Sequence, residues 1–343
     1  MLISTKEESR MDVFIGPYFS RYYQEYPLTL IDIGARGGLE KNWQCAKRYL
    51  KTIGFEPDKQ EFNNLIHSLD NKSITYFNTA LYEKKTTLDF NIMRERGLSS
   101  ILKPNREFID RYPDSGRYDI LQTIKIEVDT LDNVLNKNKN IDVDFIKLDA
   151  QGSELSILKG ANNILSSSVI GLEIEVEFVQ LYQDQPIFSE INEFIKNFGF
   201  RLFDLRTYFW KTYRGMKYGK PKGQIIFADA LFIIDIDKFL TILNRIQDAF
   251  LRKTKVLRAI SVCFIYGYLD YAFEIFEATK NLFGDEEITI FNRKITREIF
   301  LARKIPNFKG KNRISDLLRS LANFIHPSNN SWVYWRRDLG NIE

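Results

Sequence analysis

The chain has 343 residues, of which 44% are hydrophobic and 27% charged, as expected for a globular protein with a large core. Its 49 basic and 45 acidic side chains leave a net charge of +4, so composition gives no reason to expect a nucleic-acid partner. Two cysteines, Cys45 and Cys263, exclude a disulfide framework and a cysteine-rich metal site, and they fit a reducing compartment.

Residues 1–27 predict an N-terminal helical segment, with an amphipathic pattern over residues 8–24. Acidic residues stand where a secretory signal has a basic and then an apolar stretch. The longest apolar stretch, residues 259–269, is too short to cross a bilayer. We therefore expect a cytoplasmic protein without a transmembrane segment.

An acid-and-glycine turn follows the first apolar run, which starts at residue 28, and a second apolar run also ends on an acid. The turn reads Asp32-Ile33-Gly34-Ala35-Arg36-Gly37-Gly38, and the second run ends in Glu56-Pro57-Asp58. Such a pair of strand ends is typical of a doubly wound sheet that holds an adenosine-containing cofactor. Glu56 is expected to accept hydrogen bonds from the ribose hydroxyls.

The spacing of the glycines distinguishes between cofactors. The dinucleotide pattern Gly-x-Gly-x-x-Gly would need glycines where Arg36 and Leu39 stand, which disfavours NAD. Asp32, Gly34 and Gly38 instead resemble the first motif of S-adenosylmethionine-dependent methyltransferases. The alternative is a strand-turn-helix unit that binds no ligand.

Strands and helices alternate up to residue 78, which predicts a parallel sheet with ligands at the carboxyl ends of its strands. Helices are predicted from residue 38 to about residue 50 and over 60–69, and a third strand over 74–78. Residues 86–128 interrupt this rhythm. Their strands, 87–92 and 124–128, flank a mobile loop that forms either a lid over the cofactor or a surface hairpin.

A buried strand then ends on Asp149, and a tight turn starts a helix with Ser153 as its expected N-cap. Asp149 is expected to point into the ligand crevice, or else to bond nearby backbone as a turn residue. In the next strand, alternation puts Glu173, Glu175 and Glu177 on one face. Three acids there are costly unless they pair with cations, are protonated or face a solvated cleft.

These motifs together resemble the FkbM family of S-adenosylmethionine-dependent methyltransferases over about residues 28–235. The resemblance is carried by residues 32–35, 55–57, 80–81, 145–161, 177–182 and 229–232. It implies a Rossmann-like methyltransferase sheet, mostly parallel with its last strand antiparallel, and methyl transfer to a hydroxyl, often on a sugar or a secondary metabolite. Arg36 departs from the family, which usually has Asn there, although a guanidinium can still reach the cofactor carboxylate.

The candidate cofactor contacts lie at the predicted strand ends and turns. They are Asp32, Gly34, Ala35, Arg36, Gly38, Glu56, Pro57, Ala80, Leu81, Ser99, Asp149 and Gln151. The only histidines, His67 and His326, fall on the helix after the second strand and near the C-terminus. The base that takes the hydroxyl proton is therefore expected among the carboxylates of Asp149, Glu175 and Glu177. No metal-binding motif is present, although these carboxylates have suitable ligand chemistry.

Residues 205–223 combine six basic and five aromatic side chains with no acid, which suits a sugar ring beside a phosphate or carboxylate. The expected acceptor is a small molecule or a glycan, anionic or nucleotide-linked, contacted by Arg206, Trp210 and Tyr182. The alternatives for this segment are a solvated basic loop or an RNA contact.

After residue 237 the alternation stops, and helices are predicted over 238–250, 256–266, 269–282, 298–303 and 314–325. This helical extension is expected to provide a packing surface or a homodimer contact. The last helix has an apolar stripe bordered by basic residues, and we expect it to pack on the catalytic domain. Peripheral contact with an anionic membrane is the alternative.

The sequence thus predicts an α/β fold with a helical segment at 1–27, a Rossmann-like methyltransferase domain at 28–237 and an α-helical extension at 238–343. The expected function is O-methyl transfer to a hydroxyl of a sugar or glycan. The alternatives are a scaffold with reduced catalysis that recruits glycan-assembly partners, and a methyltransferase of another small molecule. Nitrogen methylation is disfavoured because the Asn/Asp-Pro-Pro-Tyr/Phe motif is missing after Asp149.

Overall fold

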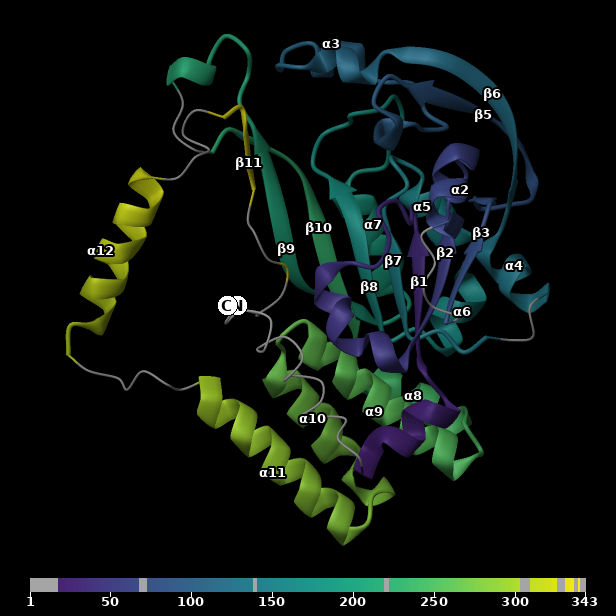
Figure 1. Cartoon of the computed structure of the whole chain (residues 1–343), viewed down its shortest axis with the longest axis vertical. Coiled ribbons are helices and arrows are strands. Elements are labelled where there is room, and N and C mark those ends of the chain that lie inside the picture. The colour runs from purple at the N-terminus through teal and green to yellow at the C-terminus, as the bar shows by residue number, and fades with distance from the viewer. Residues whose placement is uncertain are drawn as a thin grey trace.

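The computed structural model describes residues 18–67, 73–137, 141–218, 222–302, 309–325, 331–335 and 339 (Figure 1). Within these ranges the strands form an eight-stranded sheet in the order β11-β9-β10-β8-β7-β1-β2-β3 and a smaller sheet in the order β4-β6-β5. Residues 18–25 are helical, and the rest of the predicted N-terminal helix lies outside the described residues.

The parallel half of the large sheet is built around β1 (Leu28–Ile33), every residue of which is buried. It lies between β2 (Leu50–Phe55) and β7 (Phe145–Leu148), with β3 (Ile74–Phe77) and β8 (Gly171–Glu177) as the next strands outward. The crossovers carry η1 (Lys41–Tyr49), α2 (Lys59–His67), α4 (Leu131–Lys137), α5 (Glu154–Lys159) and α6 (Asn162–Ser167). The apolar strand runs follow from this arrangement, because helices cover a parallel sheet on both faces.

The other half of the sheet contains antiparallel pairs. After α7 (Phe188–Lys196), β9 (Phe200–Trp210) leads to β10 (Gln224–Ile234), which inserts antiparallel between β8 and β9. The short β11 (Val333–Trp335) adds to the outer edge of β9. The predicted doubly wound sheet, mostly parallel with an antiparallel last strand in the methyltransferase segment, is therefore confirmed.

The small sheet lies between β3 and β7 in the chain and consists of β4 (Ala80–Leu81), β5 (Thr86–Met93) and β6 (Ile120–Asp129). Between β5 and β6 stand η2 (Arg96–Leu98), α3 (Arg106–Ile109) and η3 (Ser115–Tyr118). The predicted strands are present, and the loop predicted between them contains short helical turns. Ile109, Tyr112 and Tyr118 are buried there in a second apolar cluster that includes Tyr182 and Trp210.

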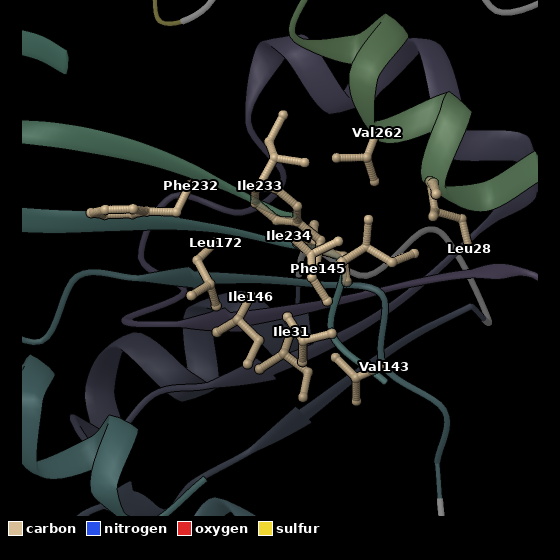
Figure 2. Packing of buried hydrophobic residues seen from close by; sticks show 14 of the residues in the cluster. Leu28, Ile31, Val143, Phe145, Ile146, Leu172, Phe232, Ile233, Ile234 and Val262 are labelled. Carbon is tan, nitrogen blue, oxygen red and sulfur yellow. The ribbon is translucent and has the colours of Figure 1, made fainter. Parts of the chain in front are cut away.

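The C-terminal helices begin with α8 (Ile236–Arg245), α9 (Ala249–Ile265) and α10 (Leu269–Thr279), followed by η5 (Lys280–Leu282) and α11 (Asp285–Ala302). Helix α9 is buried from Thr254 to Ile265 and shares one apolar core with the large sheet. Figure 2 shows Val262 of α9 directed toward the side chains of the sheet, next to Leu28. The helices that follow the sheet therefore complete its core.

A buried charge network fastens α9 to the sheet. Asp144 is fully buried and accepts hydrogen bonds from the Thr29 amide, Lys255 Nζ and Arg258 Nη1, each at 2.8 Å. The partly exposed Asp142 lies 2.9 Å from the same two cations. Because buried charges are tolerated only when paired, the network fixes how α9 sits on β1 and β7.

Helix α12 (Lys311–Phe324) departs from the expected packing. Its large apolar side chains are exposed, from Ile314 at 50% to Phe324 at 81%, and Figure 1 shows the helix standing apart from the sheet and the other helices. The prediction that this helix packs on the catalytic domain is therefore wrong. No helix in the described ranges is long and apolar enough to cross a membrane.

Candidate functional site

A cavity opens where the carboxyl ends of β1, β2 and β7 meet the small sheet. Phe90, Ile126 and Val128 of the small sheet form part of its apolar wall. Nine of the predicted cofactor contacts line it: Gly34, Arg36, Glu56, Pro57, Ala80, Leu81, Ser99, Asp149 and Gln151. Ligands bind at this edge in open α/β sheets, so the cavity lies where the sequence pattern places it.

The remaining predicted contacts, Asp32, Ala35 and Gly38, do not line the cavity. Asp32 is buried, and its Oδ1 lies 3.6 Å from Lys147 Nζ. Burial raises the pKa of Asp32 to about 6, and Lys147 opposes that shift. Ala35 is buried under the turn, and Gly38 has a positive φ of 77°. These three residues therefore shape the turn and the wall behind it.

Gly34 closes the contact between the first turn and the end of β7. Its φ is +80°, and a Cβ added there would lie closer than 3.0 Å to the carbonyl oxygen of Asp149. Its amide donates to the carbonyl of Phe55 at 3.0 Å, which ties the turn to β2. Only glycine allows the two backbones to approach this closely.

Glu56 presents a buried carboxylate to the cavity. One of its oxygens accepts a hydrogen bond from the Asp58 amide at 2.8 Å, and burial raises the pKa of Glu56 to about 7. Asp58 in turn pairs with Arg96 Nη1 at 2.7 Å. Because Arg96 and Ser99 also line the cavity, this ion pair fastens the segment after β5 over the mouth.

The carboxylates of Asp149 and Glu175 are joined by one side chain. Gln151 Nε2 donates to Asp149 Oδ1 at 2.8 Å and to Glu175 Oε1 at 2.9 Å. The hydroxyl of Tyr182 lies 3.0 Å from Gln151 Oε1 and 2.8 Å from the carbonyl oxygen of Leu98. Gln151 itself has a φ of +51°, an unfavourable conformation for a side-chain-bearing residue that is concentrated at functional sites.

Glu154 is a residue of the site that sequence reasoning missed. Its carboxylate accepts hydrogen bonds from the amides of Ala150 at 2.8 Å and Gly152 at 2.9 Å, so it holds the turn that carries Gln151. Burial raises the pKa of Glu154 to about 7. Ser153 occupies the N-cap position, but its side chain makes no cap hydrogen bond. An acid two residues after Gly152, in the first turn of the predicted helix, was the available signal.

The three glutamates of β8 share one face of the sheet but have different surroundings. Glu173 accepts a hydrogen bond from the Tyr266 hydroxyl at 2.6 Å, and burial raises its pKa to about 8. Burial and then repulsion from Asp149 raise the pKa of Glu175 well above its usual value. Glu177 is buried, and within the described residues its Oε2 has no hydrogen-bond partner. Only Glu175 of the three is partly open to solvent.

Residues 32–202 match the family model described as the methyltransferase FkbM domain. The chain contains an FkbM methyltransferase domain. The predicted resemblance is thereby confirmed, and S-adenosylmethionine is the cofactor that goes with this family.

Two solved structures are similar to part of this chain. The methyltransferase FkbM of Methylobacillus flagellatus KT aligns at 18% identity with a TM-score of 0.37, over 60% of this chain and 43% of that one. A SAM-dependent methyltransferase of Agrobacterium tumefaciens aligns at 10% identity with a TM-score of 0.30, over 64% of this chain and 61% of that one. The alignments thus span less than two thirds of either structure. No curated protein matches the chain significantly.

The structure buries or pairs the three predicted acceptor residues. Trp210 belongs to β9 and is buried, with its ring 5.5 Å from Tyr112 and 5.3 Å from Trp332, so the prediction of an exposed stacking ring is wrong. Arg206 Nε is paired with Asp229 at 2.7 Å, which leaves less of its charge for an anionic ligand. Tyr182 is fully buried behind Gln151. Strand β9 includes the first residues of the predicted 205–223 segment, up to Trp210, and these side chains therefore pack within the sheet.

Tyr208 and Phe209 are half-exposed in β9, and Tyr213 and Tyr218 farther along the segment are exposed. Tyr208 is the one of these four that lies close to the acidic face of β8. Its ring stacks on Phe227 at 4.3 Å, and Phe227 is opposite Glu177 in the sheet register. Asp229 is opposite Glu175 and next to Arg206 in the same way. A polar face therefore extends from Glu175 across β10 to β9. In the described ranges, no group of three or more His, Cys, Asp or Glu side chains could hold a metal ion.

Proposed function

We propose that this chain transfers a methyl group from S-adenosylmethionine to a hydroxyl oxygen of a sugar or glycan. The observation that carries the proposal is the link through Gln151 between Asp149, on the cavity wall, and Glu175, on the polar face of the sheet. The cavity and the polar face therefore adjoin each other at the carboxylates of Asp149 and Glu175. A methyl donor on one side and a hydroxyl acceptor on the other would therefore react between them.

The residues of the cavity fit the cofactor. Glu56, with its raised pKa and cavity-facing carboxylate, would accept hydrogen bonds from the two ribose hydroxyls. Arg36, exposed at the mouth, would pair with the carboxylate of the methionine part. The apolar wall at Leu81 and Phe90 suits the adenine ring. When bound, the cofactor supplies an activated methyl group on a positively charged sulfonium.

Glu175 is the carboxylate best placed to take the hydroxyl proton. Asp149 lines the cavity that would hold the positively charged sulfonium, so its carboxylate is placed for an electrostatic contact with the donor. Burial and repulsion from Asp149 raise the pKa of Glu175, which makes its carboxylate a stronger base than an ordinary glutamate. Gln151 is hydrogen-bonded to Tyr182, and its amide fixes the positions of both carboxylates. Glu177 is buried beyond this pair, and we assign it a supporting role.

The polar face beyond Glu175 favours a neutral sugar over a phosphate-bearing one. Arg206 is engaged by Asp229 and lies 3.6 Å from Glu173, so the face carries more acid than base. Carboxylates accept hydrogen bonds from sugar hydroxyls and repel anions. The half-exposed ring of Tyr208 would stack on the apolar side of a sugar.

The proposal is tested by incubating the chain with isotope-labelled methyl donor and a panel of neutral sugars, glycosides, nucleotide sugars and glycans. We expect label in a hydroxyl-linked methyl group of a neutral sugar or glycan, detected by mass spectrometry of the products. Label found only in amines or nucleic acid, or in none of the acceptors, would contradict the assignment.

Glu175→Gln is expected to lower kcat at least about 100-fold, since general-base assistance is worth that much, with little change in affinity for the donor. Glu173→Gln is the matched control. It makes the same substitution one pleat away on the same strand face, where the side chain contacts Tyr266 instead of Gln151. We expect the control to retain a kcat close to that of the unmodified chain. Equal activities of the two variants would remove Glu175 as the base.

A further inference from the structure

Helix α12 exposes a continuous apolar stripe. Its members recur at intervals of three and four residues and therefore share one face of the helix. They are Ile314 (50% exposed), Leu317 (61%), Leu318 (61%), Leu321 (54%), Phe324 (81%) and Ile325 (76%). Soluble proteins rarely leave so many large apolar side chains together in water, so this stripe marks an interaction surface.

The charges around the stripe have one predominant sign. Residues 309–325 contain four basic residues and a single acid, Asp316. Lys309, Arg313 and Arg319 are exposed, and helical periodicity places Arg313 at the border of the stripe. An apolar face bordered by basic side chains complements a surface that is apolar inside and anionic at its rim, as an anionic membrane is.

The length of α12 sets how it would meet such a surface. Fourteen residues at about 1.5 Å rise give a helix of about 21 Å, shorter than the roughly 30 Å of a bilayer core. The helix therefore suits the plane of the interface. A second copy of the chain is a poorer occupant, because its residues 309–325 carry one acid against four bases and so offer little negative charge to the basic side chains.

We propose that α12 docks this chain on an anionic membrane surface, with its apolar stripe among the acyl chains and its basic side chains at the phosphates. The docking does not depend on methyl transfer, and it holds whether or not the proposed acceptor is correct. It also accounts for the isolated position of α12 in Figure 1, because a helix whose apolar face meets lipid has no need of the protein core.

The test is flotation of the full chain with vesicles of phosphatidylcholine alone and of phosphatidylcholine containing about one third phosphatidylglycerol. We expect binding to the anionic vesicles, weaker binding to the neutral ones, and a decrease of the bound fraction with added salt. Replacing Leu317 and Leu321 together by Asn is expected to lower the partition coefficient at least about tenfold.

Ser315→Asn combined with Ser320→Asn is the matched control, because both residues lie on the same helix but outside the stripe. It introduces two Asn side chains, as the Leu317 and Leu321 variant does, and neither variant changes the net charge. We expect the control to bind vesicles like the unmodified chain. Arg313→Gln with Arg319→Gln should reduce binding to anionic vesicles several-fold and flatten its salt dependence. Urea unfolding of each variant verifies that the core is intact.

Three results would overturn the proposal. The first is absence of binding by the unmodified chain to anionic vesicles. The second is equal binding by the Leu317 and Leu321 variant and the Ser315 and Ser320 control. The third is a dimer, measured by light scattering, that the Leu317 and Leu321 substitutions dissociate, because the stripe would then be covered by a second copy of the chain.

Discussion

Gly34→Ala is expected to damage both stability and cofactor binding, for two separable reasons. An alanine at φ +80° costs about 1–2 kcal/mol because the left-handed conformation crowds its Cβ. The new Cβ would also lie closer than 3.0 Å to the carbonyl oxygen of Asp149, so the turn after β1 must move away from the end of β7. Such overpacking costs about a further 1–3 kcal/mol. The free energy of unfolding is therefore expected to fall by about 2–5 kcal/mol.

Gly37→Ala separates the two costs. Gly37 has the same φ of +80°, but an added Cβ there meets nothing within 4 Å. We expect this variant to lose only the conformational part, about 1–2 kcal/mol. The difference in free energy of unfolding between the two alanine variants then measures the cost of the close approach of Gly34 to Asp149, because both variants have the same backbone strain.

Urea unfolding of both variants gives the stability difference, and calorimetric titration with S-adenosylhomocysteine gives the effect on the cavity. Because movement of the turn widens the wall beside Asp149, we expect Gly34→Ala to weaken binding more than about tenfold and Gly37→Ala to weaken it only slightly. Equal losses of stability and equal affinities in the two variants would refute the close-approach argument.

Three further predictions concern the network, the core and the pH response. Tyr182→Phe removes the hydroxyl beside Gln151 and should lower kcat about tenfold with donor affinity unchanged, measured by steady-state kinetics. Asp144→Ala leaves the two buried cations of α9 without their main partner and should cost about 3–5 kcal/mol in urea unfolding, against a smaller loss for the partly exposed Asp142→Ala. Burial raises the pKa of Glu173 to about 8, so the folded chain holds this proton more tightly than the unfolded one, and stability from this group falls as pH rises from about 5 to about 8. Glu173→Gln cannot lose a proton, so its free energy of unfolding should rise by more than about 1 kcal/mol relative to that of the unmodified chain over that pH range. A difference in free energy of unfolding that stays constant with pH would contradict the raised pKa of Glu173.

The sheet could be predicted from the sequence because its central strands are buried on both faces. The apolar runs at β1 and β7 and the alternating acids of β8 are local patterns that leave few other arrangements. The segment between β5 and β6 could not be predicted in the same way. Its short helical turns are held by the distant residues Tyr182 and Trp210, a contact that no local pattern encodes.

Some residues of the candidate site could likewise be predicted from local patterns, and others could not. Glu56 and Asp149 stand at strand ends, so the topology alone places them at the cavity. The role of Glu154 depends on hydrogen bonds to the turn of Gly152, and the pairing of Arg206 depends on strand register across β9 and β10. Charge clusters in a sequence do not reveal which partners neutralise them, and the pairing of Arg206 with Asp229 removes one of the six basic residues on which the expected anionic acceptor rested.

The measurement that tests the central claim most directly is calorimetric titration of the chain with S-adenosylhomocysteine. We expect one saturable site per chain. Glu56→Ala should weaken binding at least about tenfold, because two hydroxyl hydrogen bonds to a carboxylate are lost. Glu61→Ala, which removes a nearby acid of α2 that does not line the cavity, should leave the affinity unchanged. Absence of binding by the unmodified chain, or equal affinity in the Glu56→Ala variant, would contradict the account.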